Sequence, residues 1–350
     1  MAAALSTSIT RRSFLAGLAA TPFAAHALRA SSASATETAP TFTVLSLFHP
    51  QRLLVHADST ALDLRLDGLP FALDQATTLV IDASGSGIRI GDALHRAITL
   101  TLPSSFAVEV PGKLRRNYRS TLTIDTAAGC LRCVVGIERE LAVASIVAAE
   151  SPPHTNAEAL AAQSVAARSF LIGAVHAHAG ADFCDTTHCQ FLRDPPQADS
   201  PFTAAVLRTS GLVLQFRDRA DERSITLPAM YSRSCGGRTR TLAELGLPAR
   251  GYPYYAVECA FCRAHPERWQ RDIAHSPRSE RARLDYNRIH GWSALPGHAD
   301  SFAASSISGR GVGHGLGLCQ LGAADMAARG ARFADILAHY YPNTTLAHVG

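Results

Sequence analysis

Residues 138–177 read ERELAVASIVAAESPPHTNAEALAAQSVAARSFLIGAVHA, and this stretch decides the fold. From Glu138 to Glu150 it is rich in alanine and valine at helical spacing, and the two prolines that follow end that helix. Asn156 can cap a second helix from Ala157 to about Ala177, because its side chain accepts hydrogen bonds from helix N–H groups and alanine and leucine favour helix. The stretch predicts two helices joined by a rigid turn.

The sequence on either side of these helices has a different pattern. Before them, short apolar or alternating runs separated by Gly, Pro, Asp and Ser predict strands; these runs are Phe42 to Leu47, Leu53 to His56, Thr78 to Ile81, Ala97 to Leu102 and Ser120 to Ile124. After them we expect loops and strands through 204–216 and 225–232, a glycine-rich loop over 308–317, and short helices over about 319–329 and 333–341. This order predicts an α+β fold with a β-rich N-terminal part and one long helix.

The first thirty residues have the composition of an export signal. Arg11 and Arg12 precede an apolar stretch that ends at Phe23, and small residues follow it. The apolar core is shorter than the ~20 residues of a membrane-spanning helix, and no later stretch is long enough to anchor the chain. The adjacent arginines resemble a twin-arginine signal; the alternative is an ordinary secretion signal with a chance arginine pair. We expect a signal peptide over 1–30, a linker over 31–41, and a protein exported to the periplasm or another extracytoplasmic space.

Composition excludes some classes of function. With 47% hydrophobic and 18% charged residues the chain is an ordinary globular protein. The net charge of +4 is too small and too evenly spread to predict nucleic-acid binding.

Four potential metal ligands lie close together in the sequence: His178, Cys184, His188 and Cys189. Two thiolates and two imidazoles make the closed tetrahedral site that structural zinc prefers. We expect the first histidine at the end of the long helix and the other three on the loop leaving it, with His176 able to replace His178. The alternative is a disulfide between the two cysteines, which an oxidising compartment permits.

Glu150 is the candidate acid. It ends the first helix directly before Ser151 and two prolines, and proline restricts the residue that precedes it, so the carboxyl group is held at a rigid turn. A carboxyl group on an apolar surface tends to have a raised pKa, which suits a general acid. The alternative is a solvated glutamate at a helix end.

Two further segments point to a cleft. Five glycines between 309 and 317 let backbone approach a ligand or another segment, and His314 is the imidazole of that loop; the alternative is a tight turn with His314 bonded to backbone. No phosphate-loop or dinucleotide signature fits it. The turn from Tyr231 to Thr239 has no nucleophile elbow and is expected to line a cleft.

Several of these blocks, in order, resemble the SpoIID/LytB family. The blocks are 159–170, His188-Cys189-Gln190, 231–239, Gly311-Val312-Gly313-His314-Gly315 with Gln320-x-Gly322-Ala323, and Ile336-Leu337-x-x-Tyr340-Tyr341-Pro342. The likeness runs from about residue 118 to 346, which implies a mixed α/β catalytic domain over 118–346 and leaves a β-rich module over 42–117. Ser151, Val312 and Leu321 depart from the methionine and tryptophans usual at those places, which loosens the expected substrate contacts.

The resemblance implies a lytic transglycosylase that cleaves peptidoglycan glycan strands, best known for strands stripped of peptides, and leaves 1,6-anhydro ends. It places the catalytic carboxyl group on Glu150 and a structural zinc on His178, Cys184, His188 and Cys189. We expect substrate contacts from Gln163, Arg168, Tyr231, Ser234, His314 and Gln320. A cell-wall amidase is a possible partner.

Two other functions are compatible with parts of the pattern. A non-catalytic enhancer of a partner amidase is a role also attached to the family. A zinc amidase would need three protein ligands and an open position on the metal, and four well-placed ligands speak against it.

The remaining cysteines leave several pairings open. We expect Cys235 to form a disulfide with Cys259 or Cys262. Alternatively Cys259 and Cys262 pair with each other, or they join Cys130 and Cys133 in a four-thiolate zinc site. Cys319, beside the glycine loop, is a further possible partner.

Overall fold

The structure is a computed structural model that describes residues 39–57, 63–71, 78–85, 87–101, 105–174, 178, 180–218, 222–248, 251–291 and 293–349. The expected signal peptide over 1–30 and most of the expected linker over 31–41 lie outside these residues. Within the described ranges no helix is both long and apolar enough to cross a lipid bilayer.

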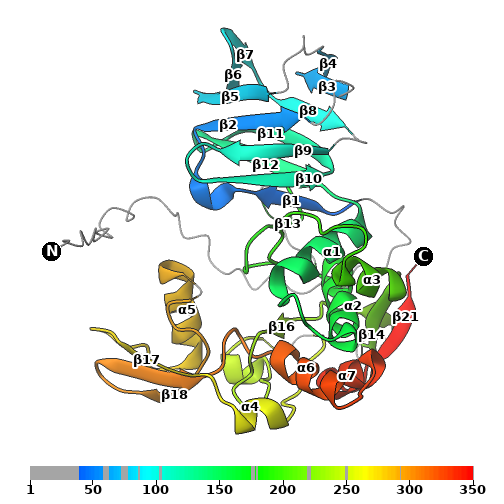
Figure 1. Ribbon diagram of the computed structural model, residues 1–350. Helices are drawn as coiled ribbons and strands as arrows, with labels where there is room; N and C mark the ends of the chain where they lie inside the picture. Colours follow the sequence, from blue (N-terminus) through cyan, green and yellow to red (C-terminus); the bar gives the residue numbers. More distant parts are fainter. Residues whose placement is uncertain are drawn as a thin grey trace, which may run out of the picture.

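Two sheets packed on one another form the N-terminal part (Figure 1). In spatial order the first sheet holds β13 (Phe183–Cys184), β1 (Thr41–Val44), β12 (Cys130–Gly136), β11 (Thr121–Ala127), β8 (Ile98–Thr101), β3 (Asp63–Leu66) and β4 (Leu69–Pro70). The second holds β10 (Leu114–Arg119), β9 (Ser105–Val110), β2 (Arg52–Ala57), β5 (Thr78–Ser84), β6 (Gly87–Ile90) and β7 (Ala93–His95). Alternate residues of both sheets are buried in one shared apolar core, for example Val55, Ile81, Ile124 and Val135. The β-rich N-terminal part and the α+β class are confirmed.

The sheets extend beyond the boundary that we expected at residues 117/118. That boundary falls inside β10, and β11 and β12 carry the first sheet on to Gly136. A later segment also joins this sheet, because β13 pairs in parallel with β1, Phe42 opposite Phe183 and Thr43 opposite Cys184. The loop that carries the candidate metal ligands is therefore anchored to the N-terminal sheet.

The helices predicted from residues 138–177 are both present, as α1 (Arg139–Glu150) and α2 (Ala157–Gly173). The Glu138 side chain caps α1 by accepting from two backbone N–H groups, and Asn156 caps α2. Helix α2 is buried on nearly every side and packs against α1, α3 (Pro201–Arg208), α6 (Gln320–Ala328) and α7 (Phe333–Tyr340).

Helix α2 ends at Gly173, earlier than the predicted end at Ala177. Ala174 has an extended backbone. At Gly173 a side-chain Cβ would lie 2.5 Å from the Thr226 carbonyl oxygen, so the neighbouring strand packs directly on the backbone there. The loops and strands expected over 204–216 are partly corrected: Ser200 caps the helix α3, Pro201 takes its first position, and the strand β14 (Leu212–Arg217) follows it.

The C-terminal part is built from small sheets and short helices. Its strands are β14 with β15 (Ser224–Thr226) and β21 (Thr345–His348), β16 (Tyr231–Ser232) with β20 (Leu318–Cys319), and β17 (Arg268–Asp272) with β19 (Ser306–Arg310) and β18 (His298–Phe302). Its other helices are α4 (Ala260–Ala264) and α5 (Glu280–His290), and short 3-10 turns lie at Ser46–Phe48 and Ala243–Leu245. Helix α5 and the β17–β19–β18 sheet form a small lobe beside the helices (Figure 1) with its own apolar core around Trp269 and Leu295.

Candidate functional site

A cavity of about 410 Å³ lies where these parts meet. Its wall is formed by the end of α1, the loop after β13, strand β16, helix α5, the glycine loop and the start of α6. Glu150, His188, Tyr231, His314 and Gln320 all contribute to the lining. The structure thus brings together four of the seven residues that we expected to act on substrate, from four separate segments.

Glu150 ends α1 at the edge of this cavity. Its Oε1 accepts a hydrogen bond from the Phe191 backbone N–H at 2.8 Å, and its backbone carbonyl accepts one from Gln320 Nε2 at 3.1 Å. Burial raises the pKa of Glu150 to about 7, against the lowering effects of the Phe191 N–H, the Tyr231 hydroxyl and the Arg193 charge. A carboxyl group with such a pKa holds a proton near neutrality and can still release it, as a general acid requires.

Tyr231 faces Glu150 from β16. Its hydroxyl donates to Gln190 Oε1 at 3.3 Å, and burial raises its pKa well above the ordinary value, so the hydroxyl remains a donor. Gln190 in turn reaches the Ala167 carbonyl on α2 at 3.4 Å. Phe191 and Gln190, which directly follow the candidate metal ligands, therefore hold Glu150 and Tyr231 respectively. Gln190 belongs to the His188-Cys189-Gln190 motif but was not among the expected site residues.

His314 lines the cavity from the glycine loop as a neutral imidazole. Its Nδ1 accepts a hydrogen bond from the Leu316 backbone N–H at 2.9 Å. Burial and the Arg283 charge lower the pKa of His314 to about 4, although the Tyr231 backbone carbonyl opposes this. At neutral pH the ring can thus hydrogen-bond a substrate but has no positive charge. His314 thus has the backbone hydrogen bond expected of a tight structural turn, and it also lines the cavity.

Gln163, Arg168 and Ser234 do not line the cavity, although we expected them to bind substrate. Gln163 is 3% exposed and accepts from the Ser151 hydroxyl at 2.8 Å, so it braces the turn after Glu150. Ser234 exchanges backbone hydrogen bonds with Val312, and its hydroxyl lies 3.5 Å from the Cys262 sulfur. Because α2 is buried almost all round, its polar side chains point into protein, which the motif alone does not reveal.

Arg168 is fully buried and makes an ion pair with Glu140 on α1. Its guanidinium also donates to the Leu212 carbonyl at 3.0 Å, so it ties α1, α2 and β14 together. We expect Arg168→Met to destabilise the fold by about 3 kcal/mol, because it leaves a carboxylate without its partner. Denaturant unfolding measures this, and Glu140→Gln added to the variant should recover part of the loss. Unchanged stability with a raised KM would instead indicate substrate binding.

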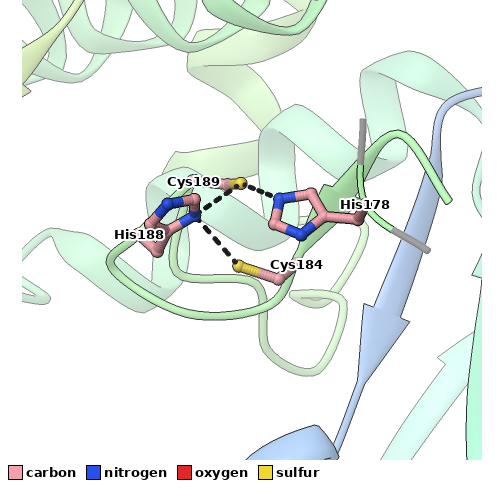
Figure 2. A group of neighbouring side chains, drawn as sticks. All are labelled: His178, Cys184, His188 and Cys189. Carbon is pink, nitrogen blue, oxygen red and sulfur yellow. Dashed lines mark hydrogen bonds between the residues drawn. The ribbon is translucent and has the colours of Figure 1, made fainter. Parts of the chain in front are cut away.

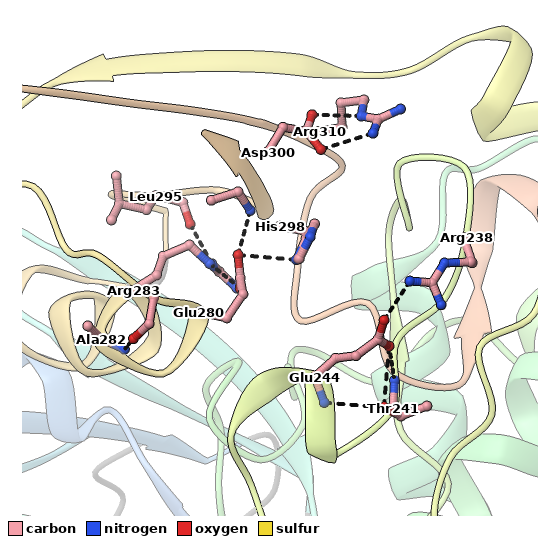
Figure 3. A network of polar contacts seen from close by, with 12 residues as sticks. Arg238, Thr241, Glu244, Glu280, Ala282, Arg283, Leu295, His298, Asp300 and Arg310 are labelled. Carbon is pink, nitrogen blue, oxygen red and sulfur yellow. Dashed lines mark hydrogen bonds and ion pairs between the residues drawn. The ribbon is translucent and has the colours of Figure 1, made fainter. Parts of the chain in front are cut away.

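Helix α5 forms a wall of the cavity that the sequence did not predict. Ser279 caps it, and Arg283, which lines the cavity, donates to Glu280 at 2.8 Å and to the Leu295 carbonyl at 3.1 Å (Figure 3). Glu280 also accepts from the Ala299 backbone N–H at 2.6 Å, which fixes α5 against β18. The local signals that could have located this helix are the serine cap before Glu280, the basic residues Arg288 and His290 in its last turn, and Gly291 after it.

The four candidate metal ligands lie together on the loop around β13 (Figure 2). His178 Nε2 is 3.0 Å from the Cys189 sulfur, and His188 Nδ1 is 3.5 Å from Cys189 and 3.9 Å from Cys184. All four ligand atoms lie within 4.8 Å of one another. Zinc bonds of about 2.0–2.3 Å in a tetrahedron require separations of roughly 3.3–3.8 Å, so the set fits one zinc ion with small adjustments.

The chemistry of these ligands suits a cation. The neighbouring Cys189 thiol, helped by His188, lowers the pKa of Cys184, while that contact and burial raise the pKa of Cys189, so one thiolate of the pair is favoured. Burial lowers the pKa of His178, which favours the neutral imidazole that binds metal. Both cysteines are free, so the alternative disulfide is not formed. His178 lies beyond the end of α2 and pairs with Ala181, which corrects its expected place on the helix; His176 lies outside the described residues.

The other cysteines correct a further expectation. Cys235 forms no disulfide with Cys259 or Cys262, since all eight cysteines, each within the described part of the chain, are free. These three instead meet Cys319 in one buried group. Cys130 and Cys133, which we considered as zinc ligands with Cys259 and Cys262, are on β12 and belong to neither cluster.

Fold and site together describe an α+β protein with a cavity built beside a Cys/His loop. Residues 130–216 match the family model described as SpoIID, Stage II sporulation protein. This segment runs from β12 to β14 and includes Glu150 and all four candidate metal ligands. Over these residues the match confirms the resemblance to the SpoIID family read from the sequence. A SpoIID domain is consistent with a cell-wall-related function; no curated protein matches the chain.

Proposed function

We propose that the protein is an exported lytic transglycosylase that cleaves peptidoglycan glycan strands, with Glu150 as its acid and base. The observation that carries the proposal is the position of Glu150: this residue lines the cavity, and burial raises the pKa of its carboxyl group to about 7. The cell-wall association of the SpoIID segment supports a glycan as substrate.

A single carboxyl group can complete this reaction. Protonated Glu150 gives its proton to the glycosidic oxygen as the bond from that oxygen to the anomeric carbon breaks. The C6 hydroxyl of the same sugar then attacks the anomeric carbon, and the Glu150 carboxylate takes the hydroxyl proton. A 1,6-anhydro ring forms, no water is consumed, and Glu150 returns to its starting state.

The second carboxyl group in the described lining is already paired. Asp285 on α5 lies 3.3 Å from the Arg281 guanidinium and 3.6 Å from that of Arg288. Ordinary glycosidases need two carboxyl groups with separate roles, and an arginine-paired aspartate is poorly suited to be the second. This arrangement favours the one-carboxyl reaction over hydrolysis.

The charge of the cavity fits an anionic glycan. Four arginines line it, and they face Asp285 in the lining and the carboxylates of Glu267 and Glu280, which pair with Arg233 and Arg283. With Glu150 protonated, four positive and three negative charges leave a surplus of +1. Muramic acid without its peptide exposes a carboxylate, so peptide-free strands would be attracted to this wall.

His178, Cys184, His188 and Cys189 would hold a zinc ion that braces the loop and, with four protein ligands, leaves no position for activating water. The loop then presents the Phe191 N–H to Glu150 and the Gln190 amide to Tyr231. These contacts would orient the Glu150 carboxyl group.

Mass spectrometry of products from purified peptide-free glycan strands tests the proposal. We expect fragments that end in anhydro sugar and are lighter by one water than hydrolysis products. Reducing ends would indicate a hydrolase. Intact strands, together with faster action of a cell-wall amidase, would favour the non-catalytic enhancer.

Tyr231→Phe should shift the pH dependence of strand cleavage to higher pH. The Tyr231 hydroxyl lowers the pKa of Glu150, so its removal raises that pKa further. Because the reaction starts from the protonated acid, the limb on which the rate falls with rising pH moves upward. A kcat profile from pH 5 to pH 9 measures the shift. Tyr252→Phe, a buried tyrosine outside the cavity lining, is the control and should leave the limb in place.

A further inference from the structure

A second group of metal-binding side chains lies outside the site described above. Cys235 follows β16, Cys259 and Cys262 lie at the start of and within α4, and Cys319 ends β20. The four are at most 2% exposed, and their sulfur atoms all lie within 4.8 Å of one another. Three segments, separated by 23 and 56 residues of chain, thus bring four thiols to one buried point.

The spacing of these sulfurs matches a single tetrahedral ion. Zinc–sulfur bonds of about 2.3 Å place the four sulfurs of a tetrahedron about 3.8 Å apart. The sulfur atoms of Cys262 and Cys319 lie 3.5 Å apart, a distance far longer than a disulfide bond of about 2.05 Å. Iron–sulfur clusters hold two or more irons between their cysteines and would force the sulfurs farther apart. Four sulfurs around one point indicate zinc or a single iron.

The surroundings of the cysteines also fit thiolates. The Gly322 backbone N–H donates to the Cys319 sulfur at 3.4 Å, the Tyr340 hydroxyl donates to Cys259 at 3.5 Å, and the Ser234 hydroxyl lies 3.5 Å from Cys262. Hydrogen bonds of this kind orient and stabilise metal-bound ligands. At Gly322 a side-chain Cβ would lie 2.5 Å from the Cys259 sulfur, so only glycine leaves room for it.

We propose that Cys235, Cys259, Cys262 and Cys319 bind a second zinc ion with four thiolate ligands, separate from the His/Cys loop. Buried like charges need a cation between them, and the ion supplies it. Zinc has no redox chemistry of its own, so four-thiolate coordination also keeps these neighbouring thiols from pairing in an oxidising compartment.

This ion would join both strands behind the cavity. β16 and β20 pair in parallel, Ser232 opposite Cys319, and each carries a ligand at or just after its end. Tyr231 is the first residue of β16. Gln320 directly follows Cys319, and its side chain donates to the Glu150 backbone carbonyl. The four-thiolate site therefore fixes two residues of the cavity from behind.

Metal analysis of the purified full-length protein tests the proposal. We expect two zinc ions per chain, one in Cys262→Ser, one in Cys184→Ser, and two in the control Cys130→Ser, whose cysteine lies outside both clusters. X-ray absorption on the wild type should give a mean of three sulfur and one nitrogen ligands per zinc. The zinc left in Cys184→Ser should have four sulfur ligands.

The outcomes separate the possibilities even if a variant fails to fold, because the wild-type spectrum is sufficient. One zinc per chain with two sulfur and two nitrogen ligands would overturn the proposal. The proposal would also fail if the denatured protein left these four cysteines unalkylated because they form disulfides. Iron instead of zinc in the four-sulfur site would overturn it as well. None of these readouts depends on glycan cleavage, so they leave the proposed function untouched.

Discussion

Glu150→Gln is expected to abolish the release of anhydro-ended glycan while the fold remains in place. Glutamine keeps an oxygen that can accept from the Phe191 N–H but has no proton to deliver to the glycosidic oxygen. Loss of a general acid typically costs ~10²–10⁴ in rate. Product formation from peptide-free strands, measured beside circular dichroism of both proteins, checks this. Turnover close to that of the wild type would remove Glu150 from the mechanism.

Although Glu150→Gln should lose activity, it should be more stable than the wild type at high pH. Burial raises the pKa of Glu150 from 4.5 to about 7 in the folded protein, so folding favours the protonated form. The wild type therefore loses stability as pH rises from about 4.5 through about 7, and glutamine does not. The melting temperature of Glu150→Gln minus that of the wild type should therefore be larger at pH 8 than at pH 5.

Glu158 at the start of α2 provides a matched control. The Arg208 side chain and the Phe333 N–H lower its pKa, so folding favours its carboxylate. Its stabilisation is present at neutral pH and is lost as pH falls, so Glu158→Gln should be less stable than the wild type at pH 8 and should keep its activity. Equal losses of activity in both variants would indicate a general effect of the substitution.

The parts of the fold that the sequence predicted depend on local chemistry. Asn156 caps α2 where the pattern places it, α1 covers nearly the predicted residues, and the predicted run from Ser120 to Ile124 overlaps β11. Capping and binary patterning act over a few residues, so a single sequence contains the information. Glu150 and the His/Cys loop were found for the same reason, since each is a short local constellation.

The remaining features depend on contacts between distant segments. The pairing of β13 with β1 joins residues about 140 positions apart, and nothing in either short run specifies its partner. Arg168 stands in a shared motif, but its inward direction follows from helices packing on every side of α2. Cys319 completes the cysteine cluster only because β20 lies beside β16. Sequence reasoning could name these residues but not the neighbours that determine their roles.

Cys184→Ser is expected to remove the zinc ion proposed for the His/Cys loop and to impair catalysis, although Cys184 does not line the cavity. Cys184 lies on β13, and the ligand pair His188 and Cys189 runs directly into Gln190 and Phe191. Loss of the ion frees the segment whose backbone N–H binds Glu150, so the acid loses its orientation. Changes to groups that orient a site in this way typically cost 10–100-fold. The melting temperature should also fall, because the ion stabilises only the folded loop.

The pH profile distinguishes this effect from simple unfolding. The Phe191 N–H lowers the pKa of Glu150, so its loss should raise that pKa and move the alkaline limb of kcat upward in the remaining active protein. Cys130→Ser, which changes a cysteine outside both clusters, should retain zinc, stability and the wild-type profile. If Cys184→Ser kept its full zinc content and its limb stayed in place, the loop would not be a metal site and could not position the acid through one.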